Sequence, residues 1–99
     1  MSDFYDRKGQ PMELLEWARD REARDNHVGN DTIDGQQVST VWLGSDHSFG
    51  EGPPLIFETM IFGGPHDKYC DRYSNEEAAI AGHNRTVAAL RDGRDPQED

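Results

Sequence analysis

Two stretches decide the fold of this chain: residues 37–43, which read Gln-Val-Ser-Thr-Val-Trp-Leu, and residues 55–62, which read Leu-Ile-Phe-Glu-Thr-Met-Ile-Phe. Both are rich in β-branched and aromatic residues, the types that favour β-strands. Alternate residues of a strand face opposite sides of a sheet. In the first stretch, one side therefore receives Val38, Thr40 and Trp42, and the other receives Ser39, Val41 and Leu43. The second stretch is the more apolar of the two, and we expect it to form a central strand.

Turn signals on either side of these stretches predict further strands. Asp34-Gly35 is a strong signal for a two-residue hairpin, because both turn positions need positive φ. Residues 44–54 hold three glycines and two prolines, which indicates a loop. Gly63-Gly64-Pro65 then turns the chain toward a short fourth strand at 69–73. We therefore expect an antiparallel meander of three to four strands within residues 27–73.

Helical signals flank this sheet. Residues 12–24 carry apolar residues at helical spacing, with acids early and arginines late, which suits the helix dipole. Pro11 is suited to the first turn of this helix. A second helix is predicted at 74–91, where Ser74 and Glu77 have the spacing of a capping box. Its packing face is expected to carry Ile80, His83, Val87 and Leu90.

The predicted fold class is α+β, with an N-terminal helix, the antiparallel meander, and a C-terminal helix packed on one sheet face. The chain has 99 residues, which suits one domain with one hydrophobic core. We expect residues 1–91 to form that domain. Residues 92–99 are charged and contain Gly93 and Pro96, so they are predicted to be a flexible tail.

The charge of the chain excludes some partners. Its net charge is −10, from 20 acids against 10 lysines and arginines. Such a surface repels nucleic-acid phosphates, so direct binding of DNA or RNA is not expected. No apolar run is long enough to span a membrane, and the first residues lack the pattern of a signal peptide. With one cysteine, Cys70, the chain forms no internal disulfide, and we expect a cytoplasmic protein.

Several blocks of the sequence resemble a family of small proteins encoded by tailed bacteriophages of actinobacteria and by their prophages. The resemblance covers most of residues 4–90 and is carried mainly by Val38–His47, Gly52–Gly64, Asp71–Ser74 and Ala81–His83. This family has no established activity, so the resemblance implies no cofactor and no catalytic residue. It implies a phage origin, a setting in the cytoplasm of the infected host, and a role outside the virion.

Five polar residues are candidates for chemistry if they meet at one end of the sheet. Glu58 lies within the most apolar strand, and a buried carboxylate needs a partner, for which Arg72 of the neighbouring strand is suited. The others are Asp46 and His47, which open the glycine-rich loop, and His83, which lies on the packing face of the second helix. Such a group suits hydrolysis or metal binding. The competing interpretation is structural: an ion pair, a turn former and a hydrogen-bonded core histidine.

Other residues are candidates for binding. Phe49 and Glu51 lie in the glycine-rich loop, and an apolar ring on a loop tip can anchor a partner protein. Tyr69 and Tyr73 lie on the predicted fourth strand, where a sheet edge offers a second surface. His66 and Cys70 stand four apart, but a single cysteine makes a poor zinc signature, so no metal is expected.

These observations favour a small acidic phage accessory protein that binds a host or phage protein. One alternative is a hydrolase or metal-binding enzyme that uses the five polar residues. Another is an acidic mimic of nucleic-acid phosphates that inhibits a nucleic-acid enzyme. A homodimer formed through an exposed strand edge is compatible with all three.

Overall fold

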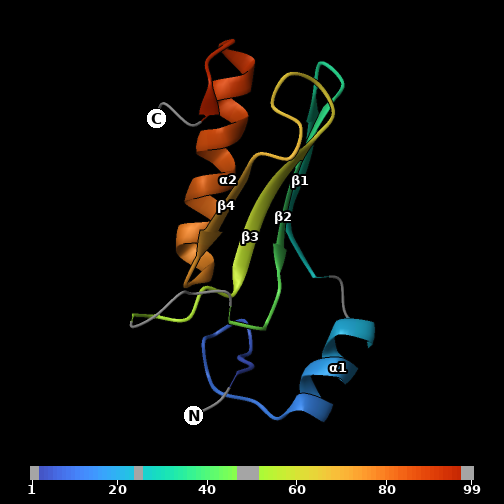
Figure 1. The fold of residues 1–99 in the computed structure, drawn as a ribbon, viewed down its shortest axis with the longest axis vertical. Helices are drawn as coiled ribbons and strands as arrows, with labels where there is room; N and C mark the ends of the chain where they lie inside the picture. The colour runs from blue at the N-terminus through green and yellow to red at the C-terminus, as the bar shows by residue number, and fades with distance from the viewer. Residues whose placement is uncertain (1–2, 24–25, 47–51, 97–99) are drawn as a thin grey trace.

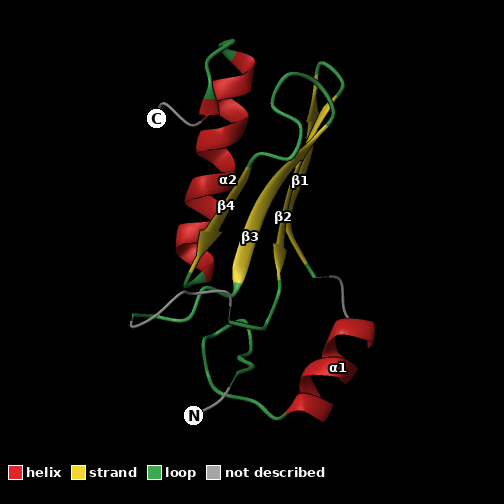
Figure 2. Cartoon of the chain, viewed as in Figure 1, coloured by secondary structure: helices red, strands yellow, loops and turns green. Residues whose placement is uncertain are grey.

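The computed structural model describes residues 3–23, 26–46 and 52–96. Its elements are, in chain order, α1 (Leu14–Ala23), β1 (His27–Ile33), β2 (Gln36–Trp42), β3 (Phe57–Phe62), β4 (Cys70–Tyr73) and α2 (Glu76–Arg91) (Figure 1). The strands form one antiparallel sheet in the order β1-β2-β3-β4 (Figure 2). The predicted α+β class and antiparallel meander are therefore confirmed.

The hairpin between β1 and β2 has the predicted turn. Ile33 pairs with Gln36, which leaves Asp34 and Gly35 as the two turn residues. Their φ angles are 49° and 78°, both in the left-handed region that Gly and Asp tolerate best. Near the other end of β1 the register shifts between His27 and Gly29, so a bulge interrupts this edge strand.

The register of the sheet sorts its side chains onto two faces. Thr40 pairs with Thr59, so both point to the same side, and their neighbours Val41 and Glu58 point to the other side. One face lies against α2, which contacts all four strands, whereas α1 lies beyond the end of the strands (Figure 1). We call the opposite side the open face; it comprises His27, Asn30, Thr32, Gln37, Ser39, Val41, Glu58, Met60, Phe62, Cys70 and Arg72.

The core between the sheet and α2 consists of two apolar clusters. One lies beside the C-terminal half of α2 and contains Ile33, Val38, Ile61, Val87 and Leu90. The other lies beside its N-terminal end and contains Trp42, Ile56, Phe57, Tyr73 and Ala79. Tyr5 and Met12 of the N-terminal arm and Trp17 of α1 complete the second cluster by packing against it.

Two elements, α1 and β3, begin at later residues than the sequence predicted. α1 begins at Leu14 rather than at residue 12, because the Met12 N–H donates to the Phe4 carbonyl. Pro11 accordingly forms a bridge with Tyr5 instead of the first helical turn. β3 begins at Phe57 rather than at Leu55, although the Ile56 N–H donates to the Tyr73 carbonyl and the Ile56 carbonyl accepts from the Leu43 N–H.

The predicted capping box of α2 is wrong by one residue. Asn75 is the N-cap, and its Oδ1 accepts a hydrogen bond from the Ala78 N–H at 2.7 Å. Ser74 lies too early for this role. The Tyr73 carbonyl still accepts from the Ile56 N–H, so the chain needs one further residue to turn into the helix.

Of the four residues predicted for the packing face of α2, His83, Val87 and Leu90 are buried, whereas Ile80 is 45% exposed. Ala79 takes the inward position, and it is fully buried against a part of the sheet that carries the bulky rings of Phe57 and Tyr73. These rings leave room for a methyl group but not for a larger side chain, and Ile80 therefore lies on the outer side of the helix.

The predicted tail does not leave the domain directly after α2. Within residues 92–96, the N–H groups of Gly93 and Arg94 donate to carbonyls of the last helical turn, and Pro96 is buried. Residues 97–99 lie outside the described part of the chain.

The position of the cap can be tested by comparing two alanine variants. Asn75→Ala removes the side-chain acceptor, so we expect it to lower the free energy of unfolding by about 1 kcal/mol in urea titrations. Ser74→Ala should change it by less than about 0.5 kcal/mol. The reverse order would restore the capping box predicted from the sequence.

Candidate functional site

A chain of five hydrogen-bonded polar side chains crosses the core beneath α2. Asp31 Oδ2 lies 2.7 Å from His83 Nε2, and His83 Nδ1 lies 2.7 Å from Thr40 Oγ1. Thr40 Oγ1 lies 2.5 Å from Thr59 Oγ1, which accepts a hydrogen bond of 3.1 Å from the Tyr73 hydroxyl. We call this set the buried polar chain. It links β1, β2, β3, β4 and α2.

All hydrogen bonds of the buried polar chain can donate in the same direction, from Tyr73 toward Asp31. Tyr73 donates to Thr59, so the Thr59 hydroxyl is available to donate to Thr40, and the Thr40 hydroxyl to His83 Nδ1. His83 then carries its proton on Nε2 and donates it to the Asp31 carboxylate. This arrangement uses the neutral imidazole and leaves no hydroxyl of the chain without an acceptor.

Local sequence features make room for these side chains. Gly29 of β1 lies against the His83 ring, and a Cβ at this position would lie 2.7 Å from Nε2. A Cβ at Gly82 of α2 would lie closer still to the Tyr73 side chain. Neither glycine has positive φ, so both are needed here for close approach rather than for their conformational freedom. The two threonines meet because they are directly paired in the register of β2 and β3.

The order carboxylate, imidazole, hydroxyl is that of a hydrolase triad, in which the histidine activates the hydroxyl for attack. A nucleophile must touch its substrate, however, and Thr40 and Thr59 have no exposed surface at all. His83 is 4% exposed, and only the Asp31 side chain reaches solvent, with 48% of its surface exposed. The buried polar chain is therefore suited to holding α2 on the sheet and not to turning over a substrate.

The pKa of Tyr73, the last residue of the buried polar chain, is shifted by its surroundings. Burial raises the pKa of Tyr73 to about 12, although the hydrogen bond to Thr59 acts in the opposite direction. Burial likewise raises the pKa of Tyr69. Both tyrosines were predicted to line an exposed sheet edge. Instead, Tyr73 is 7% exposed and Tyr69 packs against the apolar cluster beside the C-terminal half of α2.

The predicted pair of Glu58 and Arg72 is present. The two residues are directly paired in the register of β3 and β4, and Arg72 Nε lies 3.0 Å from Glu58 Oε2. The Cys70 thiol donates to the same carboxylate oxygen at 3.4 Å. Burial raises the pKa of Cys70, and Glu58 raises it further, so the sulfur stays in its poorly nucleophilic thiol form at neutral pH.

The five residues proposed for chemistry are not brought together. Glu58 and Arg72 lie on the open face, whereas His83 lies on the opposite side of the sheet, because Glu58 and Thr59 are neighbours on one strand. Asp46, at the start of the glycine-rich loop, accepts a hydrogen bond of 3.0 Å from the N–H of Leu55, at the end of that loop. His47 lies outside the described residues, as do Phe49 and Glu51.

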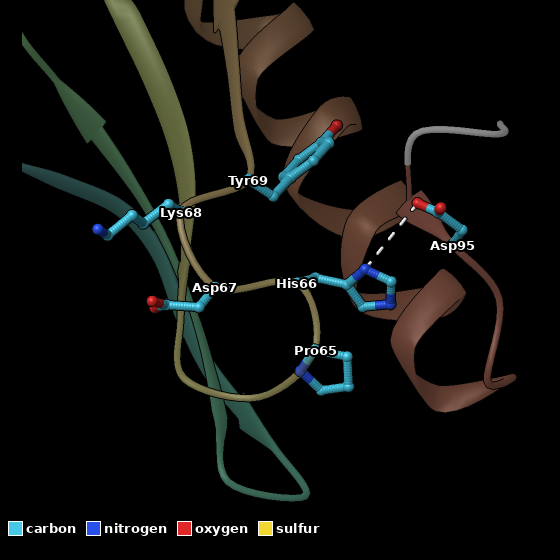
Figure 3. A pocket seen from close by; sticks show the side chains of 6 residues that line it. All are labelled: Pro65, His66, Asp67, Lys68, Tyr69 and Asp95. Carbon is cyan, nitrogen blue, oxygen red and sulfur yellow. Dashed lines mark ion pairs between the residues drawn. The ribbon is translucent and has the colours of Figure 1, made fainter.

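A cavity of about 300 Å³ lies between the loop after β3 and the residues after α2, and it is lined by Pro65, His66, Asp67, Lys68, Tyr69 and Asp95. Figure 3 shows the His66 ring pointing toward Asp95, 4.0 Å away, whereas Asp67 and Lys68 point to the other side of the loop. Asp67 accepts from the Gly63 N–H and so stabilises the turn. Because the charged groups diverge, they do not form a ligand site.

The described residues contain no group of three or more His, Cys, Asp or Glu side chains placed to hold a metal ion. Comparison with known proteins found no match for this chain among protein-family models, curated proteins or solved structures. The resemblance to small phage proteins therefore stays a prediction. Neither of the helices in the described part of the chain is long and apolar enough to cross a bilayer.

Sequence reasoning identified His83 but missed Asp31, Thr40 and Thr59. A signal for the threonines was present. Thr40 stands between Val38 and Trp42 on the inward side of its strand, and Thr59 stands likewise between Phe57 and Ile61. A hydroxyl at the centre of an apolar inward face needs a buried partner, and His83 was the polar residue predicted on the facing helix.

Removing one hydroxyl from the buried polar chain should be costly. Thr40→Val leaves His83 Nδ1 without its donor and Thr59 without its acceptor, and we expect a loss of about 1–3 kcal/mol in the free energy of unfolding. Thr32→Val, on the exposed side of β1, is the matched control and should change it by less than about 0.5 kcal/mol. Equal effects of the two changes would contradict a satisfied buried chain.

The raised pKa of Tyr73 predicts a loss of stability at high pH. An unfolded tyrosine releases its proton near pH 10, whereas folded Tyr73 keeps it to about pH 12. The folded state thus binds more protons in this window, and its stability falls as the pH rises from about 10 to about 12. Tyr73→Phe should show a shallower fall than wild type in urea titrations above pH 10, and parallel curves would refute this assignment.

Proposed function

We propose that this chain is a small acidic accessory protein, of phage origin as its resemblance implies, that acts by binding a host or phage protein in the infected cell. We further propose that α1 carries the contact surface. The observation that supports this is a pair of adjacent leucines, Leu14 and Leu15, which are 54% and 73% exposed. Large apolar side chains that stand exposed next to one another are typical of interaction sites.

Trp17 determines which side of α1 remains exposed. Its Nε1 donates to the Leu43 carbonyl at 2.8 Å, and its ring lies 4.6 Å from the Phe4 ring. Residue 15 lies two positions earlier, about 200° away around the helix. Since Trp17 faces the domain, Leu15 faces outward, and none of the described strands, nor α2, packs along α1.

The surroundings of the leucines indicate the chemistry of the partner. Glu13 and Glu16 flank them in the sequence. A cavity of about 330 Å³ between α1 and the N-terminal arm is lined by the acids Asp6, Glu16 and Asp20 and by the bases Arg7 and Lys8, of which Arg7 is paired with Glu76. A groove with an apolar floor and a basic rim complements this surface, because leucines fill the floor while lysines or arginines meet the acids. The net charge of −10 would also speed the approach of such a partner.

This proposal predicts that capture of a partner depends on Leu15. The bait is the full chain, incubated at physiological salt with lysate of an actinobacterium infected by a tailed phage. Leu15→Gln should lower the recovery of a specific partner about tenfold, since burial of a leucine contributes roughly 1.5–3 kcal/mol. Ile80→Gln, an exposed apolar residue on the outer side of α2, is the matched control and should leave recovery unchanged.

The outcomes separate this proposal from its rival. Equal recovery with both variants, or no specific partner at all, would refute binding through α1. If the captured protein is a nucleic-acid enzyme that the Leu15→Gln variant still binds and that high salt releases, the acidic surface rather than α1 is the contact. That result would support mimicry of nucleic-acid phosphates.

A further inference from the structure

The open face of the sheet has polar groups that already bond to one another. The Glu58 carboxylate accepts from Arg72 Nε at 3.0 Å and from the Cys70 thiol at 3.4 Å. Gln37 Nε2 donates to Asn30 Oδ1 at 3.1 Å. Covering a charge or an amide always costs desolvation, but the cost is smaller when a hydrogen-bond partner replaces part of the lost water. Much of this face can therefore be covered at a reduced cost of desolvation.

Apolar side chains lie among these pairs. Val41 and Met60 are half-buried between neighbouring strands, and Phe62, at the end of β3, is 46% exposed. Covering the Phe62 ring and its neighbours would contribute on the order of 25 cal/mol for each Å² of apolar surface removed from water. The face thus combines satisfied polar pairs with apolar surface that remains in contact with solvent.

The charge of the open face differs from that of the chain as a whole. Besides His27, the face carries one acid and one base, Glu58 and Arg72, so with histidine counted as neutral its formal charge is −1 + 1 = 0, whereas the whole chain carries −10 on the same count. All of the net negative charge therefore lies elsewhere. Acids at the start of α2, Glu76 and Glu77, belong to the element on the opposite side of the sheet.

We infer that two copies of this chain associate face to face through the open face. A second copy would meet strong repulsion between like charges on a surface that carries the excess acid, but not on this one. In a face-to-face pair, both α2 helices lie on the outside, which keeps their acids far apart. A basic partner, by contrast, would find no net electrostatic attraction on this face, because its single acid, Glu58, is already paired with Arg72.

The size of the face predicts a reversible dimer. Four strands about 4.8 Å apart, with about six residues rising roughly 3.3 Å each, give a plan area on the order of 400 Å² per copy. Two such faces give on the order of 800 Å² in total, below the roughly 1,200–2,000 Å² of stable protein interfaces, so we expect a weak dimer whose population depends on protein concentration. Two facing sheets would lie about 10 Å apart, as in β-sandwiches.

Sedimentation equilibrium of the full chain tests the inference with two variants of equal charge. Phe62→Asp puts a carboxylate into the contact of each copy and should raise the dissociation constant of the dimer at least about tenfold. Ile80→Asp adds the same charge at a residue of nearly the same exposure, 45% against 46%, but on the outer side of α2. It should change the constant by less than about twofold. Circular dichroism verifies that both variants fold.

The exposed thiol of Cys70 provides a second readout that needs no variant. A second copy on the open face covers Cys70, so its rate of labelling by a thiol reagent should fall as the concentration of wild-type protein rises. A chain that sediments as a monomer at every soluble concentration, with a labelling rate independent of concentration, would overturn the inference. So would a dimer that both aspartate variants weaken equally.

Discussion

The two hydrogen bonds of the His83 ring determine where α2 lies on the sheet. One nitrogen bonds to Asp31 on β1 and the other to Thr40 on β2. Apolar contacts have little directional preference, so the clusters at either end of the helix would tolerate a small rotation or shift. The imidazole tolerates neither, because a displaced ring would leave buried polar atoms without partners.

The remainder of the domain is consistent with this constraint. The register of β2 and β3 places Thr59 against Thr40, and Tyr73 on β4 completes the buried polar chain. Gly29 and Gly82 keep the backbone close to the two rings. The polar chain lies between two apolar clusters, so the core combines non-directional burial at its ends with directional bonds in its middle.

This arrangement keeps the reactive side chains of the protein away from its solvent-exposed surface. The imidazole and both threonine hydroxyls are buried, and the surface carboxylate of Glu58 is engaged by Arg72. The features that face solvent are the leucine pair on α1 and the neutral open face, the two surfaces for which we propose contacts with other proteins. These two surfaces differ in charge.

Local patterns in the sequence were sufficient for the class of fold, the Asp34-Gly35 turn and the inward position of His83, because each depends on residues close together in the chain. The pairing of Glu58 with Arg72 also followed, since it needs only two neighbouring strands. The partners of His83, the exposed position of Ile80 and the separation of His83 from Glu58 were decided by the tertiary structure alone. Each depends on how the helix and several strands align at once, and long-range packing, not local preference, determines that alignment.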